Sequence, residues 1–316
     1  MTRVFYACDL HGSMSVTRKW LHVPEAHGAD VLMFCGDLTG KMIVPFIKQN
    51  DGTTRVDYFK AKEMLQSEAE VQGMKTKLQD IGVYYFDTTA DEIKQFQEHP
   101  EKVDDFMAKA IEERMKQFCD LIIERIDTKK TKVFVMPGND DIKIVDEIIK
   151  SYEDKNIIYP LDKVTDVGGF ETISFEFVNP TPWDTPREMN ESDLKKAIDK
   201  LITRLSDPSK SIFCFHCPPI NTKLDSAPKL NKDLAIETAG GIPQFEHVGS
   251  KSVRAAIEKY QPILGLHGHI HEAFGFDQIG KTLVLNPGSE YGEGILRGYI
   301  IEMSAGGVDK YWKVEG

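Results

Sequence analysis

Short apolar runs recur along the chain, and polar residues follow each of them. Five runs dominate the pattern: residues 4–8, 31–35, 132–136, 211–215 and 263–266. Apolar runs of this length, bounded by polar or turn-forming residues, are typical of buried strands. Because residues 15–27 can form a helix between the first two runs, we predict a β-α-β unit with parallel strands and a right-handed crossover. Further strands are expected at residues 172–178, 282–285, 297–303 and 308–314.

Residues 41–130 follow a different pattern. They are rich in Lys, Glu, Gln and Met, and they include apolar residues at helical spacing: Phe106, Ile111, Met115, Phe118 and Ile122. This spacing predicts two or more amphipathic helices inserted after the second strand. Such helices can cap a site, or they can form a solvated cover or a dimer surface, and the sequence favours neither. We therefore predict an α/β fold in a single domain, residues 1–316, with a helical insertion at about 41–130.

Capping and loop signals divide the second half of the chain. Helices are predicted at residues 142–152 and 250–260, the second with Ser250 as its cap. Residues 185–188 (Thr-Pro-Arg-Glu) resemble a helix start, with a threonine cap, a proline in the first turn and a glutamate partner. Residues 218–249 form a long loop, and loops of this length in compact domains are often functional.

The net charge of the chain restricts the classes of molecule that it can be expected to bind. The 316 residues carry a formal net charge of −11, which argues against extensive nucleic-acid binding because the phosphate backbone is repelled. A small phosphate ester stays compatible with this charge, since bound metal cations reverse the local field. No signal-peptide pattern is visible, and no apolar run approaches the roughly 18 residues of a membrane span. We expect a cytoplasmic protein that does not insert into a membrane.

The cysteines point to a reducing compartment. The chain has an odd number of cysteines, the five residues Cys8, Cys35, Cys119, Cys214 and Cys217, and four of the five lie in apolar strand-like runs. Buried free thiols are the expected state. Cys214 and Cys217 have CxxC spacing, but a structural zinc site needs a second pair that this chain lacks.

The polar clusters that follow the five main runs contain the candidate metal-binding residues. They are Asp9 with His11, Asp37, Asn139 with Asp140, His216, and His269 with His271. In open α/β sheets, ligands bind beyond the carboxyl ends of the strands, so the five clusters can converge. Side chains two residues apart in extended backbone point to the same side, which suits both paired clusters. Mixed carboxylate, carboxamide and imidazole donors favour Mn, Fe or Zn over Ca.

In this order and with their flanking glycines, these motifs resemble the calcineurin-like metallophosphoesterase family. The resemblance runs from Asp9 to the Asn286-Pro287-Gly288-Ser289 turn and leaves out the 41–130 insertion. It implies a four-layer αββα sandwich that binds two divalent metal ions. By motif, the first metal would be held by Asp9, His11 and His271, the second by Asn139, His216 and His269, and Asp37 would bridge the two.

The resemblance also implies a mechanism. Two metals roughly 3.5–4 Å apart activate a bridging water for in-line displacement at phosphorus, so that no protein nucleophile is needed. Many family members carry a histidine after the motif asparagine, whereas this chain has Asp140. A carboxylate near two cations stays ionised and would repel a dianionic phosphomonoester, which favours a phosphodiesterase. His267 or a metal-bound water could then supply the proton to the leaving group, although His267 fits a structural role equally well.

Several alternatives stay open at this point. A phosphomonoesterase is the nearest alternative, and a nuclease is disfavoured by the acidic charge. Ser/Thr protein phosphatases of this superfamily carry Asp-Arg-Gly just downstream of the Gly-Asp motif, where this chain has Leu38-Thr39-Gly40 after Gly36-Asp37. A non-catalytic metal-binding scaffold is a further reading, although such relatives usually lose ligands. The expected partner is a small phosphate ester, and the sequence is compatible with a homo-oligomer.

Overall fold

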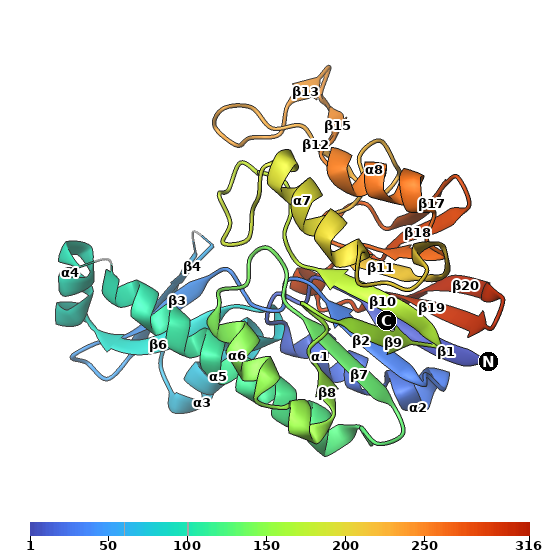
Figure 1. Ribbon diagram of the computed structural model, residues 1–316. Helices are drawn as coiled ribbons and strands as arrows, with labels where there is room; N and C mark the ends of the chain where they lie inside the picture. Colours follow the sequence, from blue (N-terminus) through green and yellow to red (C-terminus); the bar gives the residue numbers. More distant parts are fainter. Residues whose placement is uncertain (60, 100) are drawn as a thin grey trace.

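Two six-stranded sheets form the centre of the protein in a computed structural model that describes residues 1–59, 61–99 and 101–316 (Figure 1). The first sheet has the order β20-β19-β1-β2-β7-β8. Its strands are β1 (Thr2–Ala7), β2 (Val31–Cys35), β7 (Lys132–Met136), β8 (Ile157–Ile158), β19 (Arg297–Ser304) and β20 (Gly307–Glu315). The second has the order β17-β18-β16-β11-β10-β9. Its strands are β9 (Val164–Val167), β10 (Phe170–Phe175), β11 (Ile212–Phe215), β16 (Leu264–Leu266), β17 (Gly275–Ile279) and β18 (Thr282–Asn286).

The central strands of both sheets are parallel, as the sequence predicted. In the first sheet β1 pairs with β2 and β2 with β7, all parallel. In the second sheet β10, β11, β16 and β18 form a parallel series. Because parallel strands end at the same edge of a sheet, the polar residues after these strands are brought to one side of the molecule.

Strand β11 shows how the second sheet is buried on both faces. Ile212 and Cys214 belong to the main hydrophobic core, which includes residues of both sheets. Phe213 and Phe215 point to the other face, where they pack in the core beneath helices α7 (Glu191–Ile202) and α8 (Lys251–Tyr260). This alternation is the two-residue period of a strand. Parallel strands buried on both faces read as continuous apolar runs, which explains why the sequence pattern identified them.

Helices also cover the outer side of the first sheet. They are α1 (Met14–Leu21), α2 (Val23–His27), α5 (Glu101–Arg125) and α6 (Ile144–Lys150). Trp20 of α1 packs edge-on against Phe34 of β2, with ring centroids 5.5 Å apart, and stacks on Phe118 of α5. The α/β fold class predicted from the sequence is therefore confirmed.

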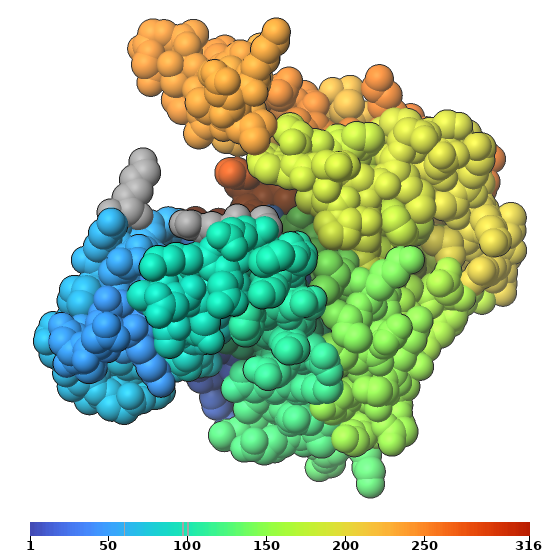
Figure 2. Space-filling model, turned by 90° about the vertical axis from the view of Figure 1, so that its left-hand side faces the viewer, coloured from blue at the N-terminus to red at the C-terminus, as the bar shows by residue number. Residues whose placement is uncertain are grey.

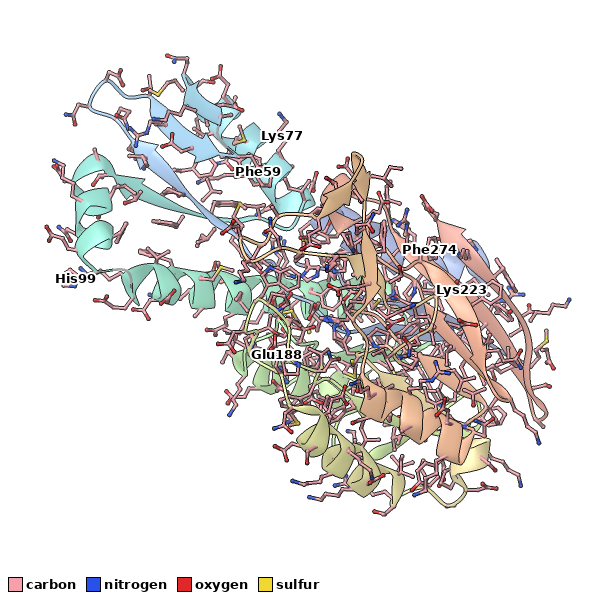
Figure 3. The ribbon with its side chains drawn as sticks, turned by 90° about the horizontal axis from the view of Figure 1, so that it is seen from above. Phe59, Lys77, His99, Glu188, Lys223 and Phe274 are labelled. Carbon is pink, nitrogen blue, oxygen red and sulfur yellow. The ribbon has the colours of Figure 1, made fainter. Side chains whose placement is uncertain are left out.

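The insertion contains more than the predicted helices. Helices α3 (Glu68–Asp80), α4 (Ala90–Glu98) and α5 are present, but so is a four-stranded sheet of order β5-β4-β3-β6. Its strands are β3 (Ile43–Lys48), β4 (Thr54–Tyr58), β5 (Ala61–Leu65) and β6 (Tyr84–Thr89). The purely helical description was thus incomplete, because these strands are short and partly exposed. The sheet and α3 share a small core of their own, and they project from the body with the labelled Phe59, Lys77 and His99 (Figure 3).

Two further segments differ from the sequence pattern or extend it. The helix start predicted at residues 185–188 is wrong: α7 begins at Glu191, capped by Asn190, and Glu188 instead accepts backbone hydrogen bonds from Thr181 and Thr185. Residues 218–249 form a long excursion with four short strands paired as β12–β15 and β13–β14. These are β12 (Ser226–Pro228), β13 (Thr238–Ala239), β14 (Ile242–Pro243) and β15 (Phe245–His247). Three short 3-10 helices complete the described elements: η1 (Glu153–Lys155), η2 (Pro208–Lys210) and η3 (Tyr291–Glu293).

Two further sequence expectations concern the cysteines and membrane-spanning helices. All five cysteines are buried free thiols. Among the described residues, none of the helices has both the length and the apolar character needed to cross a membrane.

Candidate metal centre

The seven predicted ligands meet where five parallel strands end. Asp9 and His11 follow β1, Asp37 follows β2 and Asn139 follows β7, so four side chains come from the first sheet. The second sheet provides His216 after β11 and His269 and His271 after β16. Most of these residues are buried, and His269 and His271 are partly exposed. The convergence predicted from strand ends is therefore present in the structure.

The donor atoms fall into two groups that share one carboxylate. Asp9, His11, Asp37 and His271 each place a donor atom within 4.8 Å of the others, and Asp37, His216 and His269 do the same. One oxygen of Asp37, Oδ2, lies 3.7 Å from Nε2 of His11 and 3.5 Å from Nε2 of His216. The carboxylate of Asp37 therefore stands between the two groups, in a position from which it can serve both.

Asn139 completes the second group. Its Oδ1 lies 3.1 Å from Nε2 of His216. Its Nδ2 donates hydrogen bonds to Thr185 Oγ1 at 3.0 Å and to Asp140 Oδ1 at 3.1 Å. With the amide nitrogen occupied in this way, the amide oxygen is directed at the ligand group, which is the orientation that a metal ligand needs.

The protonation states of the histidines in the cluster are compatible with binding of a cation. Burial lowers the pKa of His269 to about 3 and that of His11 well below its usual value, so both imidazoles are neutral, as metal binding requires. Burial alone would also lower the pKa of His216, but the carboxylates of Asp37 and Asp9 outweigh it and raise this pKa to about 9. The cluster thus favours positive charge beside Asp37. Carboxylate, amide and neutral imidazole donors in this arrangement fit divalent metal ions.

The ligand loops adopt unusual backbone conformations. Asp9, His11, Asp37 and His269 all have positive φ, between 45° and 70°. Such conformations cost non-glycine residues on the order of 1–3 kcal/mol each and persist only where surrounding contacts impose them. Those contacts are present: the Asp9 backbone N–H donates to Gly36 O at 2.9 Å, and the His11 N–H donates to Asp37 O at 2.9 Å.

Two glycines allow the loops to approach closely. A Cβ on Gly36, whose φ is +113°, would lie 1.9 Å from Nδ1 of His216. A Cβ on Gly138 would lie 2.3 Å from Oδ1 of Asp37. Any side chain at either position would displace a ligand, which gives a steric reason for the glycines noted in the motifs.

Residues outside the predicted ligand set hold the ligand-bearing loops together by hydrogen bonds. Asp141, which sequence reasoning missed, accepts hydrogen bonds from the backbone N–H groups of Leu38, Thr39 and Gly138, and so ties the loop after β2 to the loop after β7. The side chain of Asn286 donates to Gly268 O and Ile270 O, and Ser289 Oγ donates to Asp9 O at 2.7 Å. The Asn286–Ser289 turn thus supports the ligand loops.

Lys41 is the second residue that sequence reasoning missed. Its ammonium group forms an ion pair with Oδ2 of Asp140. The Asp140 backbone N–H donates to Asp37 Oδ1 at 2.9 Å, so this pair lies directly beside the shared carboxylate. The Asp140 carboxylate, which the sequence predicts to repel a dianionic phosphate, therefore has a cationic partner from the first residues of the insertion.

His267, the other predicted catalytic residue, lies outside both ligand groups. Its Nδ1 is 2.9 Å from the backbone carbonyl oxygens of Phe215 and Cys217. Burial lowers its pKa to about 4, so the ring is neutral. These contacts fasten the loop after β11 and give His267 a structural position, which offers no support for a role as proton donor.

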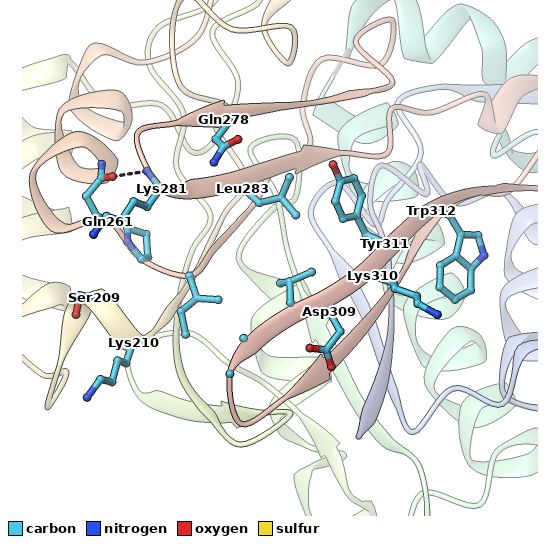
Figure 4. A pocket seen from close by; sticks show the side chains of 15 residues that line it. Ser209, Lys210, Gln261, Gln278, Lys281, Leu283, Asp309, Lys310, Tyr311 and Trp312 are labelled. Atoms are coloured by element: carbon cyan, nitrogen blue, oxygen red, sulfur yellow. Dashed lines mark hydrogen bonds between the residues drawn. The ribbon is translucent and has the colours of Figure 1, made fainter.

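A separate cavity lies away from the metal centre. It has a volume of about 990 Å³ and is bordered by residues of β17, β18 and β20, among them Gln278, Lys310 and Trp312 (Figure 4). None of the seven predicted ligands lines it.

Comparisons with known proteins support the fold. No protein-family model matches the chain. The uncharacterised protein MJ1162 of Methanocaldococcus jannaschii is 34% identical over 162 residues, which are 49% of this chain and 63% of the relative. The chain therefore matches less than two thirds of the length of this curated relative.

Solved structures align over nearly the whole chain. One crystal structure aligns with a TM-score of 0.62 and 18% identity, and the protein TT1561 of Thermus thermophilus aligns with a TM-score of 0.55 and 13% identity. Each alignment covers 99% of this chain and 98% of the other. A novel archaeal phosphodiesterase aligns with a TM-score of 0.40, which is too low to support an argument. The chain therefore shares its fold with the two solved structures whose TM-scores exceed 0.5.

Proposed function

We propose that this protein is a metal-dependent phosphoesterase and that its substrate is a small phosphodiester. The observation that carries the proposal is the pair of donor groups that share Asp37. Two adjacent cation sites joined by one carboxylate are the arrangement used for in-line displacement at phosphorus. The fold and the acidic charge of the chain agree with a small substrate whose negative charge is met by bound metals.

Each ligand has a definite part in this proposal. Asp9, His11 and His271 would hold one metal, Asn139, His216 and His269 would hold the other, and Asp37 would contact both. Mn, Fe and Zn all suit these donors. When bound, the metals would supply an activated water and positive charge for the phosphate oxygens. The buried carboxylates would fix the cations, and the loop hydrogen bonds would keep the donors aligned.

No side chain of the protein is needed as the nucleophile. Ser289 Oγ is held by its hydrogen bond to Asp9 O. Cys217 is buried, and burial raises the pKa of its thiol to about 12, which disfavours the thiolate. Neither residue therefore has the properties of an activated attacking group.

The preference for a diester rests on the pair beside the metals. A protonated histidine, the residue that many related proteins carry at this position, would add positive charge and so favour the second negative charge of a monoester. Here Asp140 and Lys41 form an ion pair that is neutral as a whole. This neutral pair does not favour the binding of a dianionic monoester over that of a monoanionic diester.

A substrate panel tests the proposal. Metal-free protein would be loaded with Mn²⁺, Zn²⁺ or Fe²⁺ and assayed with bis-p-nitrophenyl phosphate and p-nitrophenyl phosphate. We expect metal-dependent hydrolysis with a higher kcat/KM for the diester. A higher kcat/KM for the monoester would identify a phosphomonoesterase instead. Two bound metals with no turnover of any ester would indicate a non-catalytic scaffold.

The substrate would reach the metals from the side on which the surface is hollowed. Figure 2 shows this hollow between the insertion, in blue to teal, and the projecting residues 218–249, in orange. The insertion lies outside the family resemblance, and residues 218–249 contain none of its motifs, so we propose that both segments select the natural substrate.

A further inference from the structure

The insertion is fastened directly to the loops that carry metal ligands. Arg114 of α5 donates a hydrogen bond from Nη1 to Gly12 O at 2.7 Å, and its guanidinium lies over the ring of Tyr84. The hydroxyl of Tyr84 in turn accepts from the Gly40 backbone N–H at 3.1 Å. Ser13 Oγ donates to Asp80 O, at the end of α3, at 2.6 Å. These contacts join elements of the insertion to the loops after β1 and β2.

Close backbone packing makes this junction rigid. A Cβ on Gly82 would lie 2.0 Å from His11 O, and a Cβ on Gly40 would lie 2.0 Å from Gly82 O. The backbone of the insertion is therefore packed against the backbone of a metal-ligand loop. The segment that begins at Lys41 starts from this fixed point, so the position of Lys41 is set by the insertion.

The ammonium group of Lys41 is paired beside the carboxylate that both ligand groups share, and its side chain is partly exposed to solvent. It is paired with Asp140, whose N–H contacts the shared ligand Asp37, while about half of the Lys41 side chain (51%) is exposed. Lys41 is thus fixed beside the shared carboxylate by Asp140, and part of its side chain faces solvent.

We propose that Lys41 binds a nonbridging oxygen of the substrate's phosphate group, so that the insertion supplies a substrate-binding residue to the metal centre. The inference deepens the proposed function and rests on it. Lysine is a compact point charge with three donors, well suited to a phosphate oxygen. Asp140 holds the ammonium group in place before the phosphate arrives. A positive charge is thus delivered to the reaction site from the insertion, next to the position where the related proteins often have histidine.

The experiment compares Lys41→Met with Lys41→Arg and with the control Lys48→Met. Methionine keeps the length of the side chain and removes the charge, arginine keeps the charge, and Lys48 is an exposed residue at the end of β3 in the same insertion. Each protein would be loaded with Mn²⁺, and its metal content would be measured by mass spectrometry. Binding of inorganic phosphate would be measured by calorimetry. The KM for bis-p-nitrophenyl phosphate would be measured in a separate kinetic assay.

We expect Lys41→Met to weaken phosphate binding about tenfold to a hundredfold, the range for loss of one charged hydrogen bond, and to raise KM without changing metal content. Lys41→Arg should restore most of the affinity, and Lys48→Met should match the wild type. Unchanged phosphate binding in Lys41→Met would overturn the inference, as would loss of metal from this variant or absence of phosphate binding to the wild-type protein. Phosphate binding without ester hydrolysis by the wild type would count against the proposed function only.

Discussion

At the scale of single residues, Asp37 has the most demanding position. Among the residues that the structure describes, it alone contributes to both donor groups, and its Oδ2 lies within 3.7 Å of a histidine nitrogen in each. In Asp37→Asn the side chain keeps its size but loses the negative charge that would serve both cations. We expect this variant to lose metal from both sites after dialysis, as measured by elemental analysis.

The matched control is Asp104→Asn, which removes an exposed carboxylate from α5. It should retain the metal content of the wild type. If Asp37→Asn kept a full complement of two metals, Asp37 would not be a shared ligand.

His216 gives the centre a defined pH dependence. Burial opposes its charged form, but Asp37 and Asp9 raise its pKa to about 9 in the metal-free protein, so at neutral pH the ring carries a proton. A metal must displace that proton, and acid favours the protonated ring. We therefore expect Mn²⁺ affinity to fall as pH is lowered from about 9 to about 6, with release of a proton on binding.

Calorimetry in buffers of different ionisation enthalpy counts the released protons. His216→Gln should bind metal more weakly and with a smaller proton release at neutral pH. Equal proton release in the variant and the wild type would assign the proton to another group.

The sequence was sufficient to predict which strand-end residues meet at the candidate centre, but not the residues that support them. Asp9, Asp37 and His216 each follow an apolar strand, which is a local pattern that can be read from neighbouring positions. Lys41 pairs with Asp140, 99 positions away in the chain. Asp141 accepts a hydrogen bond from Thr39, 102 positions away. No local pattern identifies such pairs, and Lys41 is the first residue of a segment for which the sequence predicts only helices.

At the scale of elements, the end of β2 depends on Gly36. Its φ of +113° is costly for other residues, and an added Cβ would reach the ring of His216. We expect Gly36→Ala to destabilise the metal-free protein by about 1–3 kcal/mol from backbone strain alone and to weaken metal binding through His216. Urea unfolding and metal titration measure the two effects separately.

Gly73→Ala is the matched control for this substitution. Gly73 lies inside α3, and an added Cβ there meets no atom within 4 Å. Alanine at an open helical position stabilises by about 0.5–1 kcal/mol. Were Gly36→Ala as stable and as well loaded with metal as Gly73→Ala, the close approach of β2 to His216 would not matter.

The elements differ in how well the sequence reveals them. Strands such as β2 and β11 are buried on both faces, so their sequences are continuously apolar and easily recognised. Strand β5 of the insertion has four exposed residues out of five, Ala61 to Met64, and its charged side chains obscure any strand pattern. Residues 185–188 show the opposite error, because the hydrogen bonds of Glu188 stabilise a turn with the same residue types that cap a helix.

At the scale of the whole molecule, the candidate metal centre draws its residues from both sheets. Asp9, Asp37 and Asn139 extend from the first sheet, and His216, His269 and His271 extend from the second. Metals bound here would cross-link loops from both halves of the fold, in addition to the main core between the sheets. The folded state alone brings these donors together, so binding free energy adds to the free energy of unfolding.

Metal removal should therefore lower the stability of the entire protein. A ligand at a hundred times its Kd stabilises the folded state by about 2.7 kcal/mol, and two metals would each contribute in this way. We expect chelation to lower Tm by several degrees and added Mn²⁺ to restore it, as followed by circular dichroism. In Asp37→Asn the same treatment should change Tm little, because both sites have lost the shared carboxylate. A wild-type Tm that did not respond to chelation, in protein shown by elemental analysis to have lost its metals, would mean that the centre does not hold the two sheets together.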